Sequence, residues 1–214
     1  MLQLYTYFRS SAAYRVRIAL NLKSLSFEAV PVHLLRGGGE QHDAAFVARS
    51  PAHLIPVLRD GALTLTQSLA IIEYLEETHP EPALLPRSPA QRAQVRAIAL
   101  GIACDIHPLN NLRVIKYLEK TLAASPEQRT AWSRHWIEAG FAAIERLLEK
   151  AGTERFCFGD APSLADCCLV PQVFNAKRIG CALDSYPRIV RIYEHCARLP
   201  PFERAAPGAQ SDAE

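Results

Sequence analysis

The segment LQLYTYFRSSAAYRVRIALNL, residues 2–22, decides the fold of the first part of the chain. Its opening run, 2–7, consists of side chains that favour a β-strand. Residues 10–22 then carry apolar side chains at helical spacing, and 27–32 is a second run of strand-forming residues. A strand, a helix and another strand in this order predict a βαβ unit with parallel strands.

A hairpin signal follows further along the chain. The dipeptide Asp60-Gly61 separates two strand-forming runs, 57–59 and 63–66, and Asp-Gly is a preferred two-residue hairpin turn. Residues 67–79 then carry apolar side chains every three to four positions, which predicts a helix. The first 80 residues therefore predict a small α/β domain, with a mixed sheet and helices on its faces.

The pattern changes after residue 80. Four prolines, at 80, 82, 86 and 89, interrupt a short stretch that cannot form a regular helix. Beyond it only helical patterns occur, including a Ser-Pro helix start at 125–126 and a capping-box pattern at 163–166. The sequence thus predicts a domain at 1–80, a linker at 81–89 and an all-α domain at 90–214. The expected helices are 90–122, 127–150, 163–180, 187–198 and a short turn after Pro201.

Composition excludes several classes of protein. The net charge of +2 gives no bulk field that favours nucleic acid or membrane surfaces. No apolar run is long enough to cross a bilayer, and the first residues lack a secretory pattern. The six cysteines include no C-x-x-C pair, which predicts reduced, mostly buried thiols and no metal site in a cytoplasmic protein. Arginine supplies 19 of the 24 basic residues, which reflects either codon bias or forks that bind planar anions.

Two predicted helix starts carry hydroxyl side chains. Arg9, Ser10 and Ser11 lie between the first strand and the first helix, and Gln67 and Ser68 begin the helix expected at 67–79. Free N–H groups at a helix N-terminus attract anions, although serine at such a position is equally explained as a simple cap. The two starts together suit an extended ligand that bears carboxylates.

The dipeptide Ile55-Pro56 precedes a predicted strand, between those two helix starts in the sequence. A cis bond here would leave the backbone polar groups of Ile55 available to an extended peptide, whereas an ordinary trans proline at a strand start needs no ligand.

A polar string, CDIHPLNNLR at 104–113, stands out in the helical part. Pro108 removes a hydrogen bond and bends the helix, so the string is either a bend with a solvated edge or part of a site. His107, Asn111 and Arg113 are the candidate residues in it. Arg178, near the end of a later helix, is either a surface charge or a further anion contact.

Three blocks of the sequence resemble the zeta class of glutathione transferases. They are YTYFRSSAAYRVRIAL at 5–20, QSLAIIEYLEE at 67–77 and DCCLVPQV at 166–173, and the 104–113 string resembles the bacterial branch that isomerises maleylpyruvate. The resemblance implies a thioredoxin-like N-terminal domain, an all-α C-terminal domain, a homodimer and a glutathione site. Ala12 departs from the class pattern, which often has cysteine there.

The resemblance also assigns roles to residues. It implies that Ser10, with Ser11 nearby, contacts the glutathione thiol and activates it. The implied glutathione-binding set is Ser10, Ser11, Gln41, His42, Ile55, Pro56, Gln67, Ser68, His107 and Asn111. Within this set, Gln41 or His42 approaches the glycine end, and Ile55 before a cis Pro56 contacts the cysteinyl backbone.

The implied reaction is the cis–trans isomerisation of a maleyl to a fumaryl keto acid in aromatic ring-cleavage catabolism. Arg9, His107, Arg113 and Arg178 are the expected contacts of its dicarboxylate substrate. The main alternative is a transferase that conjugates or dehalogenates small electrophiles such as α-halo acids. A non-catalytic binding module with the same fold is a third. The sequence does not choose between maleylpyruvate and maleylacetoacetate.

Overall fold

The computed structural model describes residues 1–214 and divides the chain into two compact units. The first comprises Met1–Leu84 and Arg198–Glu214, and the second comprises Leu85–Ala197. In this division residues 198–214 lie with the first unit, whereas the sequence grouped them with the all-α part. None of the helices combines the length and the hydropathy that crossing a lipid bilayer requires.

The first unit is an α/β structure. Its strands and helices in chain order are β1 (Leu2–Thr6), α1 (Ser11–Leu22), β2 (Phe27–Pro31), α2 (Ala44–Val47), β3 (Val57–Asp60), β4 (Leu63–Thr66), α3 (Ser68–Thr78) and α9 (Pro200–Ala205). Short 3-10 turns at Arg36–Gly38 and Glu40–His42 lie between β2 and α2.

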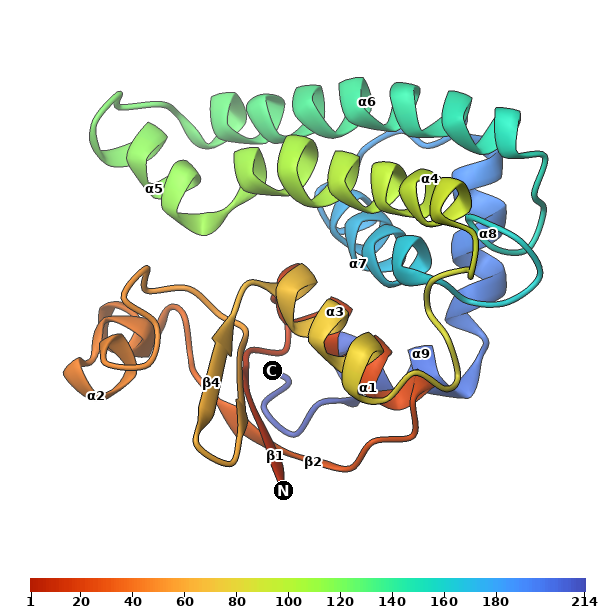
Figure 1. Cartoon of the computed structure of the whole chain (residues 1–214). Coiled ribbons are helices and arrows are strands. Elements are labelled where there is room, and N and C mark those ends of the chain that lie inside the picture. The colour runs from red at the N-terminus through yellow and green to blue at the C-terminus, as the bar shows by residue number, and fades with distance from the viewer. The chain divides into compact units, whose positions relative to one another are not determined.

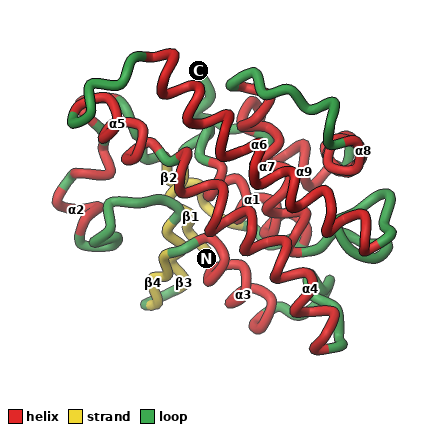
Figure 2. The backbone as a smooth tube through the Cα atoms, turned by 90° about the horizontal axis from the view of Figure 1, so that it is seen from above, coloured by secondary structure: helices red, strands yellow, loops and turns green.

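The four strands form one mixed sheet in the order β2-β1-β3-β4, seen as the yellow segment in Figure 2. Leu4 of β1 lies opposite Ala29 in the parallel pair with β2 and opposite Leu58 in the antiparallel pair with β3. The β3–β4 hairpin closes with Asp60 opposite Leu63, and Gly61 has a φ of 57°. The βαβ unit and the Asp-Gly hairpin that the sequence predicts are both confirmed.

Helices α1 and α3 pack against each other, and α9 packs against α1. The core of this unit consists of fully buried aliphatic side chains from the sheet and these helices, because each of them has one apolar face. Its aliphatic members include Leu4, Val16, Ile18, Leu20, Leu58, Ile71 and Leu75, and the aromatic ring of Phe202 packs with them.

The second unit is entirely helical. Its α-helices are α4 (Pro89–Leu100), α5 (Leu112–Lys120), α6 (Pro126–Ala151), α7 (Leu164–Arg178) and α8 (Pro187–Ala197). Figure 1 shows the long α6 running along α5 and the stretch that precedes it. Gly140 makes one close approach in this unit possible, since a Cβ atom there would lie 2.2 Å from the side chain of Ile106.

The expected single helix over 90–122 is broken into pieces. After α4 the chain forms a π-helical stretch, Gly101–Ile106, and a 3-10 turn, His107–Asn110. Asn111 then has extended backbone angles, and α5 begins after it. Pro108 lacks an N–H group and restricts the residue before it, so the bend expected at this proline becomes a complete interruption.

Two helix starts in the second unit follow the expected capping pattern. The Ser125 hydroxyl accepts a hydrogen bond from the N–H of Gln128 at 3.2 Å, and the Ser125 N–H donates to the Gln128 side chain at 2.8 Å. At the start of α7 the N–H and the hydroxyl of Ser163 both donate to the Asp166 carboxylate, at 2.8 and 2.7 Å. Local side chains therefore define where both helices begin.

Replacing Ser125 by alanine is expected to lower the free energy of unfolding by about 1 kcal/mol, because it removes the cap of α6. Urea unfolding followed by circular dichroism measures this. Ser88→Ala is the matched control, since Ser88 also precedes a proline at a helix start but its side chain makes no capping bond. An equal loss in both variants would show that the Ser125 bond contributes nothing of its own.

Candidate functional site

A tight turn between β1 and α1 presents the first candidate residues. The N–H of Ser10 donates to the carbonyl of Tyr7 at 3.0 Å, which closes the turn. Ser10 is the N-cap of α1, and its Oγ accepts a hydrogen bond from the N–H of Ala13 at 3.2 Å. Because that oxygen is the acceptor, the hydroxyl hydrogen remains available to another acceptor. Ser11 is the first residue of α1 and is half-buried.

The fully buried side chain of Arg17 holds this turn in place. Its guanidinium donates to the carbonyl oxygens of Tyr7 and Phe8 at 3.3 and 3.0 Å, and to the Thr6 hydroxyl at 2.9 Å. A fourth bond reaches the carbonyl of Ala205 at 3.0 Å. Burial lowers the pKa of Arg17 to about 10, so it is still a cation at neutral pH. This rigid donor fork fixes the turn in one geometry.

Arg9 projects from the same turn and is exposed. Its Nη2 donates to the Tyr7 hydroxyl at 3.1 Å, and its guanidinium lies 5.0 Å from the centre of the Phe8 ring. These contacts orient a positive charge next to Ser10 in the sequence, where an anionic ligand can pair with it.

The second helix start differs from the expectation in one respect. Gln67, not Ser68, is the N-cap of α3, and Ser68 is the first helical residue. Gln67 has a φ of 70°, a conformation that non-glycine residues adopt mainly where the surroundings impose it. The buried Ser68 hydroxyl accepts a hydrogen bond from Nη1 of Arg15 at 3.2 Å.

This arrangement places a buried cation behind a hydroxyl at a helix N-terminus. Arg15 is only 2 % exposed and extends from α1 to α3. Because Arg15 donates to the Ser68 oxygen, the hydroxyl hydrogen can point to a carboxylate, which the helix dipole and the cation both favour. The start of α3 is therefore an anion-binding group with three independent contributions.

Gln41 and His42 lie together after the glycine-rich segment. The Nε2 atoms of Gln41 and His42 are 3.1 Å apart, and Nδ1 of His42 is 3.2 Å from Nδ1 of His53. Gly39, at a φ of 116°, makes room for the Gln41 amide, since a Cβ atom there would lie 2.4 Å from it. The side-chain oxygen of Gln41 is buried and has no hydrogen-bond partner. A ligand N–H group would satisfy it.

The Ile55–Pro56 peptide bond is cis, as the resemblance implies. Ile55 is buried in the same apolar cluster as Tyr7, Phe8 and Val57. The cluster thus connects the backbone next to Pro56 with the turn that carries Ser10, although the two segments are far apart in the sequence.

The remaining candidates belong to the second unit. His107 begins the 3-10 turn, and Asn111 caps α5 by accepting a hydrogen bond from the N–H of Arg113 at 3.1 Å. Arg178 is the last residue of α7, and its Nη2 donates to the side chain of Asn175 at 2.8 Å. Both arginines are exposed. That these residues face the same ligand as the first unit stays a prediction.

The protein's own buried thiols are poor nucleophiles. Burial raises the pKa of Cys157 and of Cys196, and the nearby carboxylate of Asp166 raises both further. Both therefore stay protonated at neutral pH, and the thiolate is the reactive form of cysteine. Neither Cys157 nor Cys196 is therefore expected to act as a nucleophile.

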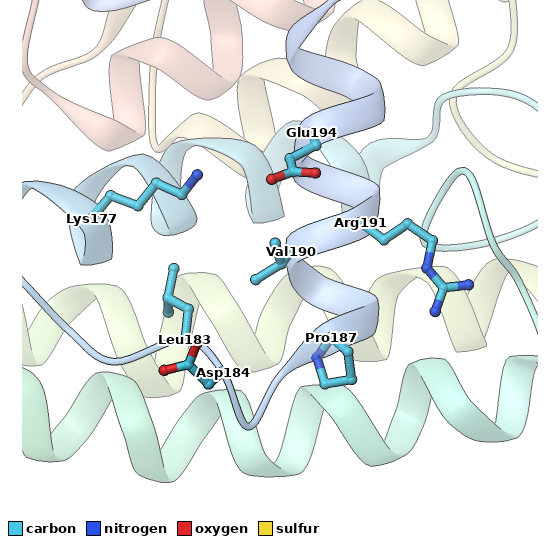
Figure 3. Close-up of a pocket in the computed structure, with 7 residues that line it drawn as sticks. All are labelled: Lys177, Leu183, Asp184, Pro187, Val190, Arg191 and Glu194. Atoms are coloured by element: carbon cyan, nitrogen blue, oxygen red, sulfur yellow. The ribbon is translucent and has the colours of Figure 1, made fainter.

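A depression of about 340 Å³ between α7 and α8 does not match a dicarboxylate. Its lining contains two cations, Lys177 and Arg191, and two anions, Asp184 and Glu194, so the charges cancel. Figure 3 shows Lys177 and Glu194 pointing toward each other, while Arg191 points away from them. Arg191 forms an ion pair with Glu154.

The sequence did not single out two residues of this site, Arg15 and Arg17. They occupy helix positions next to apolar neighbours, where arginine is normally exposed. The only signal was the excess of arginine itself, which says nothing about position. Their partners are Ser68, which is 53 residues away from Arg15, and the β1–α1 turn.

Two family models cover most of the chain. The glutathione S-transferase N-terminal domain matches residues 4–83, and the glutathione S-transferase C-terminal domain matches residues 113–195. Among individual proteins, a probable maleylacetoacetate isomerase of Vibrio cholerae is 53% identical over 98% of this chain and 97% of its own length. A maleylpyruvate isomerase of a Ralstonia species is 49% identical over 99% of this chain and all of its own length.

Solved structures indicate the same family as these sequence comparisons. A holo structure of maleylpyruvate isomerase, described as a bacterial glutathione S-transferase of the zeta class, has a TM-score of 0.96 at 48% identity and covers 99% of this chain and 100% of its own. A maleylacetoacetate isomerase of Methylobacterium extorquens AM1, with bound malonate and glutathione, has a TM-score of 0.94 at 41% identity and covers 99% of both chains. The chain therefore belongs to the glutathione S-transferase family, within the zeta-class group of maleylacetoacetate and maleylpyruvate isomerases.

Proposed function

We propose that this protein is a glutathione-dependent isomerase that converts a maleyl keto acid, maleylpyruvate or maleylacetoacetate, into its fumaryl isomer during aromatic ring cleavage. The observation that carries the proposal is the Ser10 hydroxyl. It stands at the N-terminus of α1 on a turn fixed by Arg17, and its hydrogen remains available because its oxygen already accepts from Ala13.

The residues of the first unit fit glutathione. The tripeptide has two carboxylates, an amine, two amide N–H groups and a thiol. Ser68, with Arg15 behind it, suits the carboxylate of the γ-glutamyl end. The unpartnered oxygen of Gln41 suits an N–H donor, and His42 beside it suits the carboxylate of the glycine end. Ile55 before Pro56 and Gln67 complete the set on this unit.

Glutathione, when bound, supplies a thiol whose reversible addition turns the substrate double bond into a single bond about which rotation is easy. The role of Ser10 is to donate a hydrogen bond toward the sulfur position. Together with the dipole of α1 this donor favours the thiolate over the thiol and lowers its pKa. Ser11 is the second hydroxyl at the same helix start. Neither serine needs to form a covalent bond.

The substrate carries two carboxylates, so its binding requires fixed cations. Arg9, Arg113 and Arg178 supply planar donor forks that bind carboxylates in pairs of hydrogen bonds. His107 and Asn111 add polar contacts to substrate or glutathione. Negative charge that develops on the substrate during addition is stabilised by the same cations.

Replacing Arg113 or Arg178 by alanine is expected to lower kcat/KM for maleylpyruvate by about ten- to a hundredfold, because each removes a charge-assisted hydrogen bond to a carboxylate. Steady-state kinetics measures this, and calorimetric titration checks that glutathione still binds. Arg146→Ala is the control, since Arg146 is an exposed arginine of α6 outside the proposed site. Wild-type kinetics in both variants would remove the arginines from the substrate site.

The proposal is tested by counting thiols during turnover. An isomerase returns glutathione unchanged, so the free-thiol concentration stays constant while the fumaryl product accumulates. A transferase acting on α-halo acids or other electrophiles consumes one thiol for each product molecule. Stoichiometric thiol loss with the maleyl substrate would therefore replace the isomerase proposal by the transferase.

We also infer a homodimer located in the cytoplasm. Both inferences are supported by the resemblance to the zeta class. Sedimentation equilibrium measures the first directly, and a mass equal to one chain at micromolar concentration would overturn it.

A further inference from the structure

Residues 198–214 are anchored to the first unit at several points. The Asn21 side chain donates to the carbonyl of Pro201 at 2.9 Å, and Phe202 is fully buried. After α9 the chain continues through a turn in which the Gln210 side chain donates to the carbonyls of Arg204 and Ala206 at 2.9 and 2.8 Å. This segment is therefore held in a defined course that leads to Asp212.

Asp212 contacts the turn that carries Ser10. Its Oδ2 accepts a hydrogen bond from the backbone N–H of Phe8 at 3.0 Å, across 204 residues of sequence. The carbonyl oxygen of Phe8 accepts a hydrogen bond from Arg17 at 3.0 Å. Both backbone polar groups of Phe8 are thus held by charged side chains from outside the turn, and Ser10 follows two residues later.

The two charged groups also act on each other. Burial lowers the pKa of Arg17, while electrostatic interactions with the Tyr14 side chain and the Asp212 carboxylate raise it in part. Asp212 therefore stabilises the cation that holds the carbonyl side of the turn, in addition to its own bond on the N–H side. A bond to a charged acceptor is stronger than one between neutral groups.

Glu214, in the same segment, has a different set of partners. Its Oε1 lies 3.1 Å from Nε2 of His33 and 3.2 Å from Nη2 of Arg36, both after β2. It makes no bond to the backbone of the turn. Glu214 therefore offers a control that perturbs the same segment and removes one carboxylate without releasing Phe8.

We propose that Asp212 is a positioning residue of the isomerase, which holds the Phe8–Ser10 turn so that the Ser10 hydroxyl points to the thiol. The part of this proposal that concerns catalysis rests on the proposed function. The part that concerns the turn does not, because it is a statement about the protein without ligand. The two parts are measured separately.

The experiment compares Asp212→Ala, Asp212→Asn and Glu214→Gln with the wild type. Hydrogen exchange of the Phe8 amide in the ligand-free protein should be at least about tenfold faster in the alanine variant, because it loses the bond to a charged acceptor. Asparagine keeps a side-chain oxygen that can accept from Phe8, so it should restore most of the protection. Glu214→Gln should exchange as the wild type does.

The kinetic effects of the three variants should follow the same ranking as their exchange rates. In Asp212→Ala, kcat/KM for the maleyl substrate should fall on the order of ten- to a hundredfold, as expected when a reacting group is slightly misplaced. The thiol pKa of bound glutathione, read from thiolate ultraviolet absorbance, should rise, so the acid limb of the pH–rate profile moves to higher pH. A merely structural role would leave that limb in place.

Three results would overturn the proposal. One is wild-type exchange of the Phe8 amide in Asp212→Ala, and another is faster exchange with an unchanged pH–rate profile. The third is an equal effect of Glu214→Gln. If instead the wild-type protein shows no isomerase activity, the proposed function fails. In that case the exchange data and the thiol pKa still decide whether Asp212 positions the turn.

Discussion

Replacing Ser10 by alanine is expected to lower kcat/KM for isomerisation on the order of 10²- to 10³-fold, because it removes a preoriented donor aimed at a developing negative charge. The thiol pKa of bound glutathione should rise toward the ordinary value of about 8.5. At neutral pH the thiolate fraction then falls. Thiolate absorbance in the binary complex and steady-state kinetics measure the two effects independently.

Ser10→Thr is the control for this change. Threonine keeps the hydroxyl and the ability to cap α1, so it should retain more activity than alanine. Loss of the cap alone should cost about 1 kcal/mol of stability, which a thermal melt detects and which does not by itself alter the thiol pKa. An unchanged thiol pKa in Ser10→Ala would remove Ser10 from its proposed role.

Replacing Asp166 by alanine is expected to lower the free energy of unfolding by about 3–5 kcal/mol, because it leaves several buried donors without an acceptor. Asp166 is fully buried. Its carboxylate accepts hydrogen bonds from the N–H groups of Cys157 and Ser163 at 2.7 and 2.8 Å, and from the Ser163 hydroxyl at 2.7 Å. It therefore joins the start of α7 to the preceding loop. Urea unfolding measures the loss.

Asp160→Ala is the matched control, since Asp160 lies in the same loop with a side chain that is 96% exposed and a surface pair to Arg155. Its expected effect is below about 0.5 kcal/mol. Comparable losses in the two variants would show that burial of the Asp166 carboxylate has no special importance. Asp166→Asn should lie between them, since its amide has one oxygen for the three donors.

The same residue predicts a pH dependence. Burial raises the pKa of the Asp166 carboxyl, although its hydrogen bonds oppose the shift. Because the folded protein then binds this proton more tightly than the unfolded chain, protonation favours the native state. The contribution is complete below the unfolded pKa, about 3.9, and is lost as the pH rises through the higher folded value. The stability of the wild type relative to Asp166→Asn should therefore decline over that range.

Features set by neighbouring residues could be predicted from the sequence. The Asp60-Gly61 hairpin and the 163–166 capping box depend on side chains a few positions apart, and both are present in the structure. The chemistry of such turns and caps is local, so one sequence is sufficient to recognise it.

Features that join distant segments could not be predicted in this way. The bonds from Arg15 to Ser68 and from Phe8 to Asp212 connect residues 53 and 204 positions apart. No periodicity marks either pair, because each depends on how the first unit folds. The positive φ of Gln67 is likewise marked by no local sequence pattern.

The positions of the arginines explain more than their number. Two of the chain's arginines, Arg15 and Arg17, are buried and bind the two helix starts. Three others, Arg9, Arg113 and Arg178, are exposed and are candidates for binding carboxylates. The excess of arginine therefore includes both buried structural residues and exposed candidate ligands. Lysine, with a single ammonium group, would not reproduce the fork of bonds that Arg17 makes.

The reaction proposed for this protein is the isomerisation of a maleyl keto acid with glutathione as a recycled cofactor. Its most direct test is a rate measurement with purified protein and each of the two substrates, maleylpyruvate and maleylacetoacetate, with and without glutathione. We expect fumaryl product from at least one substrate, only when glutathione is present, with no loss of free thiol. Conversion at the same rate without glutathione, or no conversion of either substrate with it, would rule out this reaction.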